Sequence, residues 1–243
     1  MILSVLDVTD PSLACNVGGD APAGLTAEAA AGSTVTFTMI RWPDDHLGPV
    51  DHYMASCEGS CTQFDATNAK WFKLDEDGYD NGVWASTKLI QNNLSASTTI
   101  PADLKPGEYL IRHEIIALHS PGQPQFYPAC AQVKVTGSGT QSPSSADLVD
   151  IPGVYDTTVF PDIWADSFHS FTNPGPPVAF SSSGSNTGSE PVFGRIKLQG
   201  TRTNLVGSFC ETQSLIKCCL SSFPDKHWQW HMSQSQGQAT GNI

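Results

Sequence analysis

The chain has 243 residues and a formal net charge of −12 at pH 7, from 12 Lys and Arg against 24 Asp and Glu. A negative charge of this size argues against binding to nucleic-acid phosphates and against docking on anionic membranes. Hydrophobic residues make up 39% of the chain, and 21 Gly and 17 Pro interrupt it, which is typical of short strands joined by turns. We therefore expect one large all-β domain, with no nucleic acid and no membrane as partner.

The first residues, MILSVLDVTDP, have no basic region and no small-residue cleavage site, and their short apolar run ends at Asp7. They do not read as a signal peptide, and no stretch of the chain is apolar enough to predict a membrane helix. We expect the natural protein to begin upstream of Met1.

Alternating apolar residues then mark the strands of a sandwich. In STVTFTMIRW, Val35, Phe37 and Met39 share one face, and CAQVKVTG alternates in the same way. Between these stretches, KWFKLDEDGYDNGVWASTKLI predicts a strand, a loop and a helical turn near Trp84 to Leu89. The stretch STTIPADLKPGEYLIRHEIIAL predicts a short strand, a turn and a long strand. The pattern indicates an antiparallel β-sandwich.

The chain becomes loop-like from GSGTQSPSSADLV onward, and an aromatic, proline-rich coil follows that we expect to lie across the sandwich. Past Ser181, SSSGSNTGSE is a flexible linker by composition. We predict a β-sandwich domain over 1–181, and over 182–243 a low-complexity linker with an unrelated, disordered tail.

Seven cysteines divide into four in the body and three in the tail. An even four in an acidic, Gly- and Ser-rich body suggests a secreted protein with two disulfides. Cys57 and Cys61 in CEGSC either close a tiny loop or form half of a zinc site, and no second pair at suitable spacing follows. Cys15 would then pair with Cys130, which closes a loop worth about 4–5 kcal/mol. Asn93 in NLS is an acceptor for N-glycosylation.

Two stretches carry polar residues that could form a site. In WPDDHLGPV, His46 is followed by Gly48 and Pro49. A loop histidine is most often merely solvated, but this Gly-Pro holds the loop rigid, and rigid loops are where ligands are placed. In RHEIIALHSPGQPQFYPAC, a short turn could lay Gln125 and Tyr127 beside His119. Spacing alone leaves open whether these three form a functional site or a self-satisfied polar cluster.

A neighbouring histidine does not join this group, because His113 and His119 lie about 20 Å apart along an extended strand and cannot share one metal. The acidic run Asp75, Glu76, Asp77 and Asp80 could supply the paired carboxylates of a glycoside hydrolase, but nothing in the sequence fixes a pair across a cleft. G-x-S-x-G, P-loop and H-E-x-x-H motifs are absent from the sequence. Common hydrolase chemistry is therefore unsupported.

Several stretches taken in order resemble the fungal lytic polysaccharide monooxygenases of auxiliary activity family 9, over roughly residues 4–181. They are GSTVTFTMIRWPDDHLGPVDHYMASCEGSCTQFD, WFKLDEDG, VWASTKLI, TIPADLKPGEYLIRHEIIALHS, QFYPACAQVKVTGSG and PGVYD with FPDIW and PGPPVAF. The resemblance implies an immunoglobulin-like (fibronectin-type) antiparallel sandwich with long loops and a flat binding face. It also implies one copper ion held by a brace of two histidines, one of which is N-terminal and also ligates through its amino group.

The resemblance assigns a role to each candidate. His46 matches the second brace histidine, Tyr127 the distant axial ligand, and His119 and Gln125 the outer-sphere pair that hydrogen-bonds the oxygen species. Trp164 matches an aromatic of the flat face, and the four body cysteines match the disulfides Cys15–Cys130 and Cys57–Cys61. The implied reaction is hydroxylation of cellulose or a related β-1,4-glucan at C1 or C4, in a secreted monomer that receives electrons from a small reductant or a redox protein.

One departure from the family is serious. Met1 is not a histidine, so two of the three brace nitrogens are absent from the sequence, and His46 alone should hold copper weakly. We interpret the chain as N-terminally truncated. A glycan-binding sandwich without oxidation, and an inactive fragment, are the alternatives.

Overall fold

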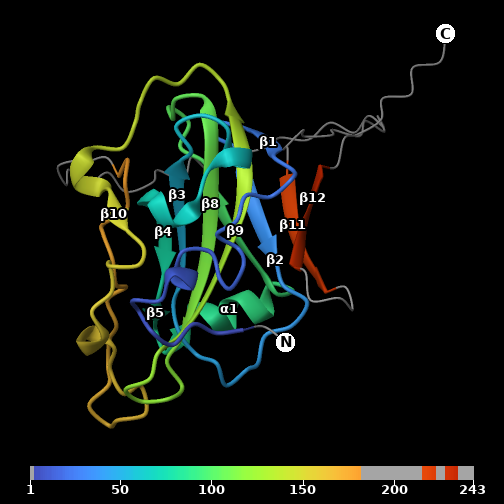
Figure 1. Cartoon of the computed structure of the whole chain (residues 1–243). Helices are drawn as coiled ribbons and strands as arrows, with labels where there is room; N and C mark the ends of the chain where they lie inside the picture. Colours follow the sequence, from blue (N-terminus) through green and yellow to red (C-terminus); the bar gives the residue numbers. More distant parts are fainter. Residues whose placement is uncertain (1–2, 182–214, 223–227, 235–243) are drawn as a thin grey trace, which may run out of the picture.

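The protein is described from a computed structural model that covers residues 3–181 and, for the backbone, 215–222 and 228–234 (Figure 1). Ten strands form two packed sheets, and a further pair forms a small ribbon. Among these residues, every helix is too short or too polar to cross a membrane. The predicted all-β immunoglobulin-like sandwich is confirmed.

The first sheet has six strands in the order β1-β9-β8-β3-β4-β10. Their bounds are β1 Ala27–Ala30, β3 Val50–Ser56, β4 Lys70–Asp77, β8 Gly107–Ala117, β9 Gln125–Thr136 and β10 Val149–Asp150. The second sheet has four strands in the order β12-β11-β2-β7. Their bounds are β2 Thr34–Thr38, β7 Ser95–Thr99, β11 Leu215–Ser222 and β12 Trp228–Gln234.

The remaining elements are short. The ribbon pairs β5 (Tyr79–Asp80) with β6 (Val83–Trp84), and the helix α1 (Ala85–Gln91) follows where the sequence predicts a helical turn. The 3-10 turns are η1 Pro11–Leu13, η2 Cys61–Gln63, η3 Ala66–Asn68, η4 Ser145–Asp147 and η5 Thr157–Val159.

Two strand pairs differ from the antiparallel expectation. β1 runs parallel to β9, and β11 runs parallel to β2. In both cases a long stretch of chain separates the partners, and a long crossing permits the parallel direction that a hairpin forbids. Alternation of apolar residues carries no information on this choice.

The division of the chain at residue 181 stays a prediction, and most of the expected linker lies outside the described residues. Within the predicted disordered tail, however, the structure places the antiparallel hairpin β11–β12. β11 pairs with the edge of β2, as seen at the right of Figure 1. This pairing satisfies backbone groups that an uncovered edge strand would expose.

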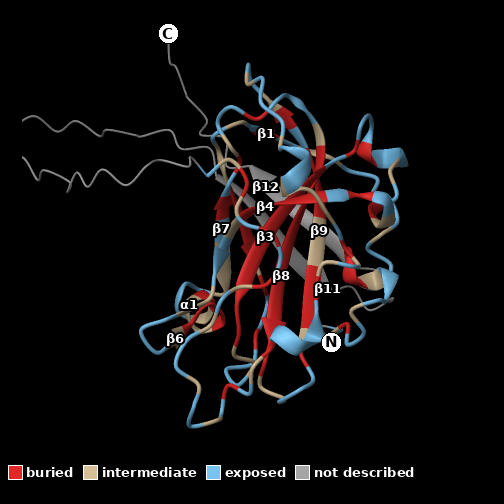
Figure 2. Ribbon diagram, turned by 90° about the vertical axis from the view of Figure 1, so that its left-hand side faces the viewer, coloured by how far each residue is buried: buried red, intermediate tan, exposed pale blue. Residues whose placement is uncertain are grey.

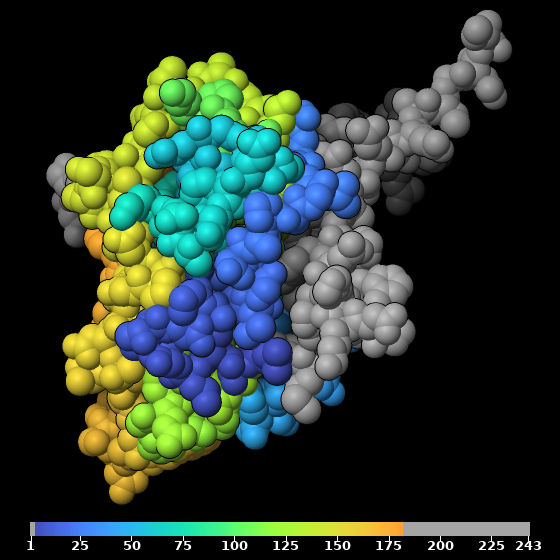
Figure 3. Space-filling view, viewed as in Figure 1, coloured from blue at the N-terminus to red at the C-terminus, as the bar shows by residue number. Residues whose placement is uncertain are grey.

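Both faces of the six-stranded sheet are buried. Phe37, Met54 and Ile111 pack between the two sheets, whereas Trp71 and Phe126 belong to a second core on the outer face. Figure 3 shows this outer face covered by the N-terminal residues in dark blue and flanked by the segment from about 143 to 181 in yellow and orange. Burial on both sides explains why β8 reads as a nearly continuous apolar run, red in Figure 2, and not as a clean alternation.

Both predicted disulfides are present. Cys15 bonds to Cys130 across 115 residues and fastens the N-terminal segment to β9, while Cys57 and Cys61 close the small loop before η2. The zinc alternative for the latter pair is thereby excluded.

Candidate metal and substrate site

His46 lies in the loop that connects β2 to β3, and this loop is fixed from several sides. The Trp42 indole Nε1 donates to the His46 carbonyl at 3.0 Å, and the Gly48 amide donates to Ser86 Oγ at 3.1 Å. A Cβ at position 48 would collide with the carbonyl oxygen of Ile116 in β8, so only glycine allows the loop to lie this close to the sheet. The rigidity predicted from Gly-Pro is therefore a property of the packing.

Three further candidates meet where β8 ends and β9 begins. The chain turns after Ala117 and returns at Gln125. The amide Nε2 of Gln125 lies 3.4 Å from Nε2 of His119, and the Tyr127 hydroxyl donates to Gln125 Oε1 at 2.7 Å. The short turn thus brings these side chains together, as the spacing predicts.

The two loops place their side chains against each other. The rings of His46 and His119 stack with centroids 4.0 Å apart and an interplanar angle of 22°, and the Tyr127 ring lies 6.1 Å from that of His46. The Trp42 ring packs edge-on against both His46 and Tyr127, with ring centroids 5.8 and 4.8 Å apart. Sequence reasoning assigned no role to Trp42, although its place just before a rigid loop was the available signal.

Hydrogen bonds and burial set the charge of this group. Asp45 Oδ1 lies 2.8 Å from His46 Nδ1, and this hydrogen bond lowers the pKa of the Asp45 carboxyl. Burial, followed by the charge of His46, lowers the pKa of His119, so His119 is neutral at pH 7. Burial also raises the pKa of Tyr127, which keeps its phenol protonated.

These residues fit only part of a copper site. Because Asp45 engages Nδ1 of His46, Nε2 is left as the donor atom. His119 stacks on His46 and does not aim its edge at a common point. Within residues 3–181, no group of three or more His, Cys, Asp or Glu side chains could hold a metal ion. The described chain therefore supplies one imidazole donor, a phenol and polar surroundings, and not a complete ligand set.

Trp164 lies at the same end of the molecule. Its indole Nε1 donates to the carbonyl of His119 at 2.9 Å, and 57% of the residue is exposed. An aromatic ring that is held by one polar contact and still faces solvent can stack on a ligand. The structure thus places Trp164 beside the histidines, while its role in substrate binding stays a prediction.

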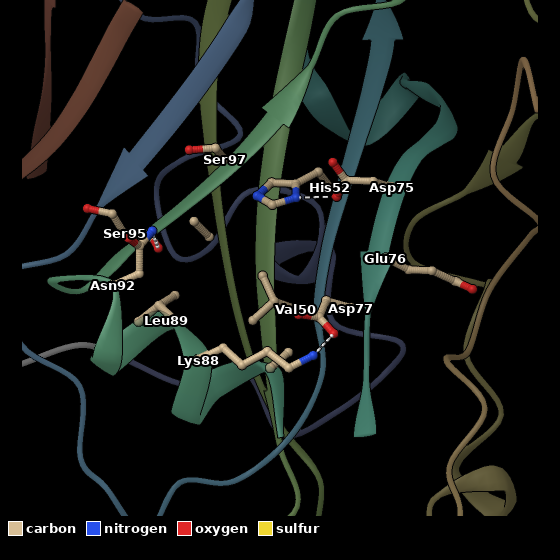
Figure 4. Close-up of a pocket in the computed structure, with 12 residues that line it drawn as sticks. Val50, His52, Asp75, Glu76, Asp77, Lys88, Leu89, Asn92, Ser95 and Ser97 are labelled. Atoms are coloured by element: carbon tan, nitrogen blue, oxygen red, sulfur yellow. Dashed lines mark hydrogen bonds and ion pairs between the residues drawn. The ribbon is translucent and has the colours of Figure 1, made fainter. Parts of the chain in front are cut away.

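The acidic run lies elsewhere, around a pocket of about 260 Å³ between β4, α1 and β7 (Figure 4). Asp75 bonds to His52 Nδ1 at 2.6 Å, Glu76 to Lys73 at 2.6 Å and Asp77 to Lys88 at 2.7 Å. Each of these three carboxylates is held by a cation or an imidazole, and Asp80, the fourth acid of the run, does not line the pocket and accepts from the Asn81 amide. This arrangement does not present two carboxylates across a cleft, as glycoside hydrolysis requires.

His113 of β8, which strand spacing separates from His119, lies beside a different histidine. Nδ1 of His113 lies 3.0 Å from Nε2 of His52, and the Phe37 ring stacks on His113 at 5.0 Å. Burial, with His52 second, holds the pKa of His113 well below its usual value. This pair lies inside the sandwich and apart from His46.

Asn93 lies just past the end of α1. It is exposed and has a positive φ of 53°, so a glycan attached there would meet no packed surface. Glycosylation at Asn93 stays a prediction.

The fold and the site together define an immunoglobulin-like β-sandwich with an aromatic and polar cluster at one end. The sequence model of Auxiliary Activity family 9 (formerly GH61) matches residues 3–172, and the chain belongs to this family.

Individual relatives of the chain carry the name of the same family. The chain is 44% identical over 188 residues to "AA9 family lytic polysaccharide monooxygenase A" of Geotrichum candidum, covering 75% of this chain and 64% of that protein. It is 40% identical to monooxygenase B of Heterobasidion irregulare, covering 72% and 75%. It spans only 35% of the Geotrichum candidum monooxygenase C. The chain thus spans less than two thirds of several relatives.

Solved structures show the same fold. The crystal structure of HiLPMO9B superposes with a TM-score of 0.68 at 40% identity, covering 72% of this chain and 82% of that one. A cellulose-active polysaccharide monooxygenase from M. thermophila superposes with a TM-score of 0.66 at 39% identity, covering 73% and 84%.

Proposed function

We propose that this chain forms the larger part of the catalytic domain of a copper-dependent monooxygenase. It would cleave cellulose or a related β-1,4-glucan oxidatively, by hydroxylation at C1, C4 or both. The observation that carries the proposal is the cluster of His46, His119, Gln125 and Tyr127, which two separate loops bring together. The names of the relatives, and the cellulose-active M. thermophila enzyme, support the reaction class and the substrate.

Each residue has a proposed role that follows from its chemistry. His46, through its Nε2, and Tyr127 would be the residues of this chain that hold the metal. His119 and Gln125 would hydrogen-bond and orient the oxygen cosubstrate without ligating the metal. Copper, when bound, would supply the activation of oxygen or peroxide. The further nitrogen donors would come from an N-terminal histidine, which is not among the described residues.

The surroundings of the reaction are proposed on the same basis. Trp164 would stack on a pyranose ring of the glucan at the flat face. A small reductant or a redox protein would supply electrons. Two disulfides fit a secreted, extracellular fungal protein, and Asn93 would carry its glycan. We propose that the protein acts as a monomer.

The proposal can be tested through the products. A chain extended before Ser4 by the His-led N-terminal segment of a family member would be incubated with swollen cellulose, copper and ascorbate. Mass spectrometry should detect oligosaccharides oxidised at C1 or C4, and the His46→Ala variant of the same protein should release none. Unoxidised oligosaccharides, or equal oxidation by the variant, would contradict the proposal.

One observation favours a second function. The described residues offer a single imidazole donor for copper, yet Trp164 is exposed, which suits glycan binding without oxidation. In the same assay this function predicts retention on cellulose, abolished by Trp164→Ala, with no oxidised product from the extended chain.

A further inference from the structure

The segment that carries Trp164 is tied to the sheet at two buried points. On its N-terminal side, the hydroxyl of Tyr155 donates to the Glu114 carboxylate. On its C-terminal side, Nδ2 of Asn173 donates to Asp51 Oδ1 at 2.7 Å. Trp164 stands nine residues from each of these points, so the exposed ring is in the middle of a loop closed at both ends.

Both ties converge on one place in the sheet. Asp51 of β3 and Glu114 of β8 are directly opposed partners in the antiparallel ladder, and they are 1% and 0% exposed. Two buried carboxylates side by side repel each other, which is costly without compensation. We expect such a pair where the hydrogen bonds of its carboxylates hold another segment of the chain in place.

The two buried carboxylates have different numbers of hydrogen-bond partners to offset their repulsion. Arg112 holds Glu114 with two hydrogen bonds of 2.6 and 2.9 Å. Asp51 faces Lys73 and Glu76 from β4 and Glu114 from β8, and its Oδ2 has no hydrogen-bond partner among residues 3–181. Asn173 is therefore the one side chain seen to donate to Asp51 within that range.

The backbone is shaped to admit the C-terminal tie. A Cβ at Gly78 would collide with Oδ1 of Asn173, so this glycine leaves the room that the amide occupies. The carbonyl of Pro174, the residue after Asn173, accepts a hydrogen bond of 2.7 Å from the buried Lys73 ammonium. The segment runs down the flank of the molecule between the two ties, yellow to orange in Figures 1 and 3.

We propose that Asp51 and Glu114 form a clamp that closes the loop 155–173 and thereby positions Trp164 for substrate binding. Asp51 and Asn173 are positioning residues, because neither belongs to the cluster around His46 and His119. The role of Trp164 on the substrate rests on the proposed function above. The clamp supplies the rigidity that a half-exposed aromatic needs in order to stack without an ordering cost.

The test compares variants for cellulose binding and for amide hydrogen exchange, with the chain as it exists. Asn173→Ala should weaken binding to microcrystalline cellulose at least threefold and speed exchange in peptides from 156–172. Asp51→Ala should do the same. Asp51→Asn keeps an acceptor oxygen and should restore both readouts.

Two controls separate the possible failures. Asn68→Ala alters an exposed asparagine at the end of η3 and should change neither readout. Trp164→Ala should weaken binding while leaving exchange in the loop intact. If Trp164→Ala binds as wild type, the proposed substrate face is wrong. If only Trp164→Ala weakens binding, and Asn173→Ala does not, the clamp is overturned.

Discussion

Replacing Asp51 by asparagine should flatten the pH dependence of folding stability between about pH 4 and pH 7. Burial, opposed in part by the Lys73 ammonium, raises the pKa of this carboxyl from 3.8 to about 7. The folded state therefore holds a proton that the unfolded state releases above pH 3.8. The stabilisation from this proton is complete below pH 3.8 and is lost as the pH rises toward 7.

The size of the effect follows from the shift. About three pKa units at 1.36 kcal/mol each give about 4 kcal/mol between the two ends of the window. For a chain of this size, that corresponds to a difference of roughly 8–16 °C in melting temperature. Asparagine keeps the shape and the acceptor oxygen but cannot ionise. The side chain at position 51 should therefore add no pH dependence to the folding stability of the variant.

Thermal and denaturant unfolding of wild type and Asp51→Asn, with disulfides intact, would be measured at pH 4.5, 5.5, 6.5 and 7.5. The variant should gain stability relative to wild type as the pH rises, because only wild type pays for ionising a buried acid. Taking the difference removes the other titrating groups, which the two proteins share. A difference that is constant across these pH values would refute the reasoning.

Three further changes test other parts of the account. Arg112→Met removes the two hydrogen bonds that Arg112 donates to the buried Glu114 carboxylate and should cost about 3–5 kcal/mol in chemical denaturation; a loss below 1 kcal/mol would contradict the ion-pair assignment. Replacing Cys15 and Cys130 together by Ala opens a loop of 115 residues and should lower the free energy of unfolding by about 4–5 kcal/mol, whereas an unchanged midpoint would argue against the bond. Gln125→Ala should leave the melting temperature and copper affinity of the His-led protein within error while slowing product formation at least tenfold, and equal rates would remove Gln125 from the proposed machinery.

Local sequence patterns predicted most of the fold. Alternating side chains in β2 and β9 predicted strands, because a half-buried sheet repeats every second residue. Cysteine number and spacing predicted both disulfides. Parallel pairing at β1 and β11 was not predictable, since the direction of an edge strand depends on how the chain returns to it.

The site was predictable only where its members are close in sequence. The turn between β8 and β9 joins His119 to Gln125 over six residues, so strand geometry alone suggested that they meet. The stacking of His46 on His119 joins residues 73 apart, and only the family resemblance brought them together beforehand. The tie between Asp51 and Asn173 spans 122 residues and has no periodic signature, so it emerged from the structure.

Copper titration followed by electron paramagnetic resonance tests the central claim most directly, namely that His46 is a ligand in a copper brace. The protein carrying a His-led N-terminal segment should bind one copper tightly and give a type 2 signal with nitrogen couplings. The His46→Ala variant of that protein, and the chain beginning at Met1, should both lack this signal. A tight brace-like signal from the chain beginning at Met1, or its survival in His46→Ala, would contradict the account.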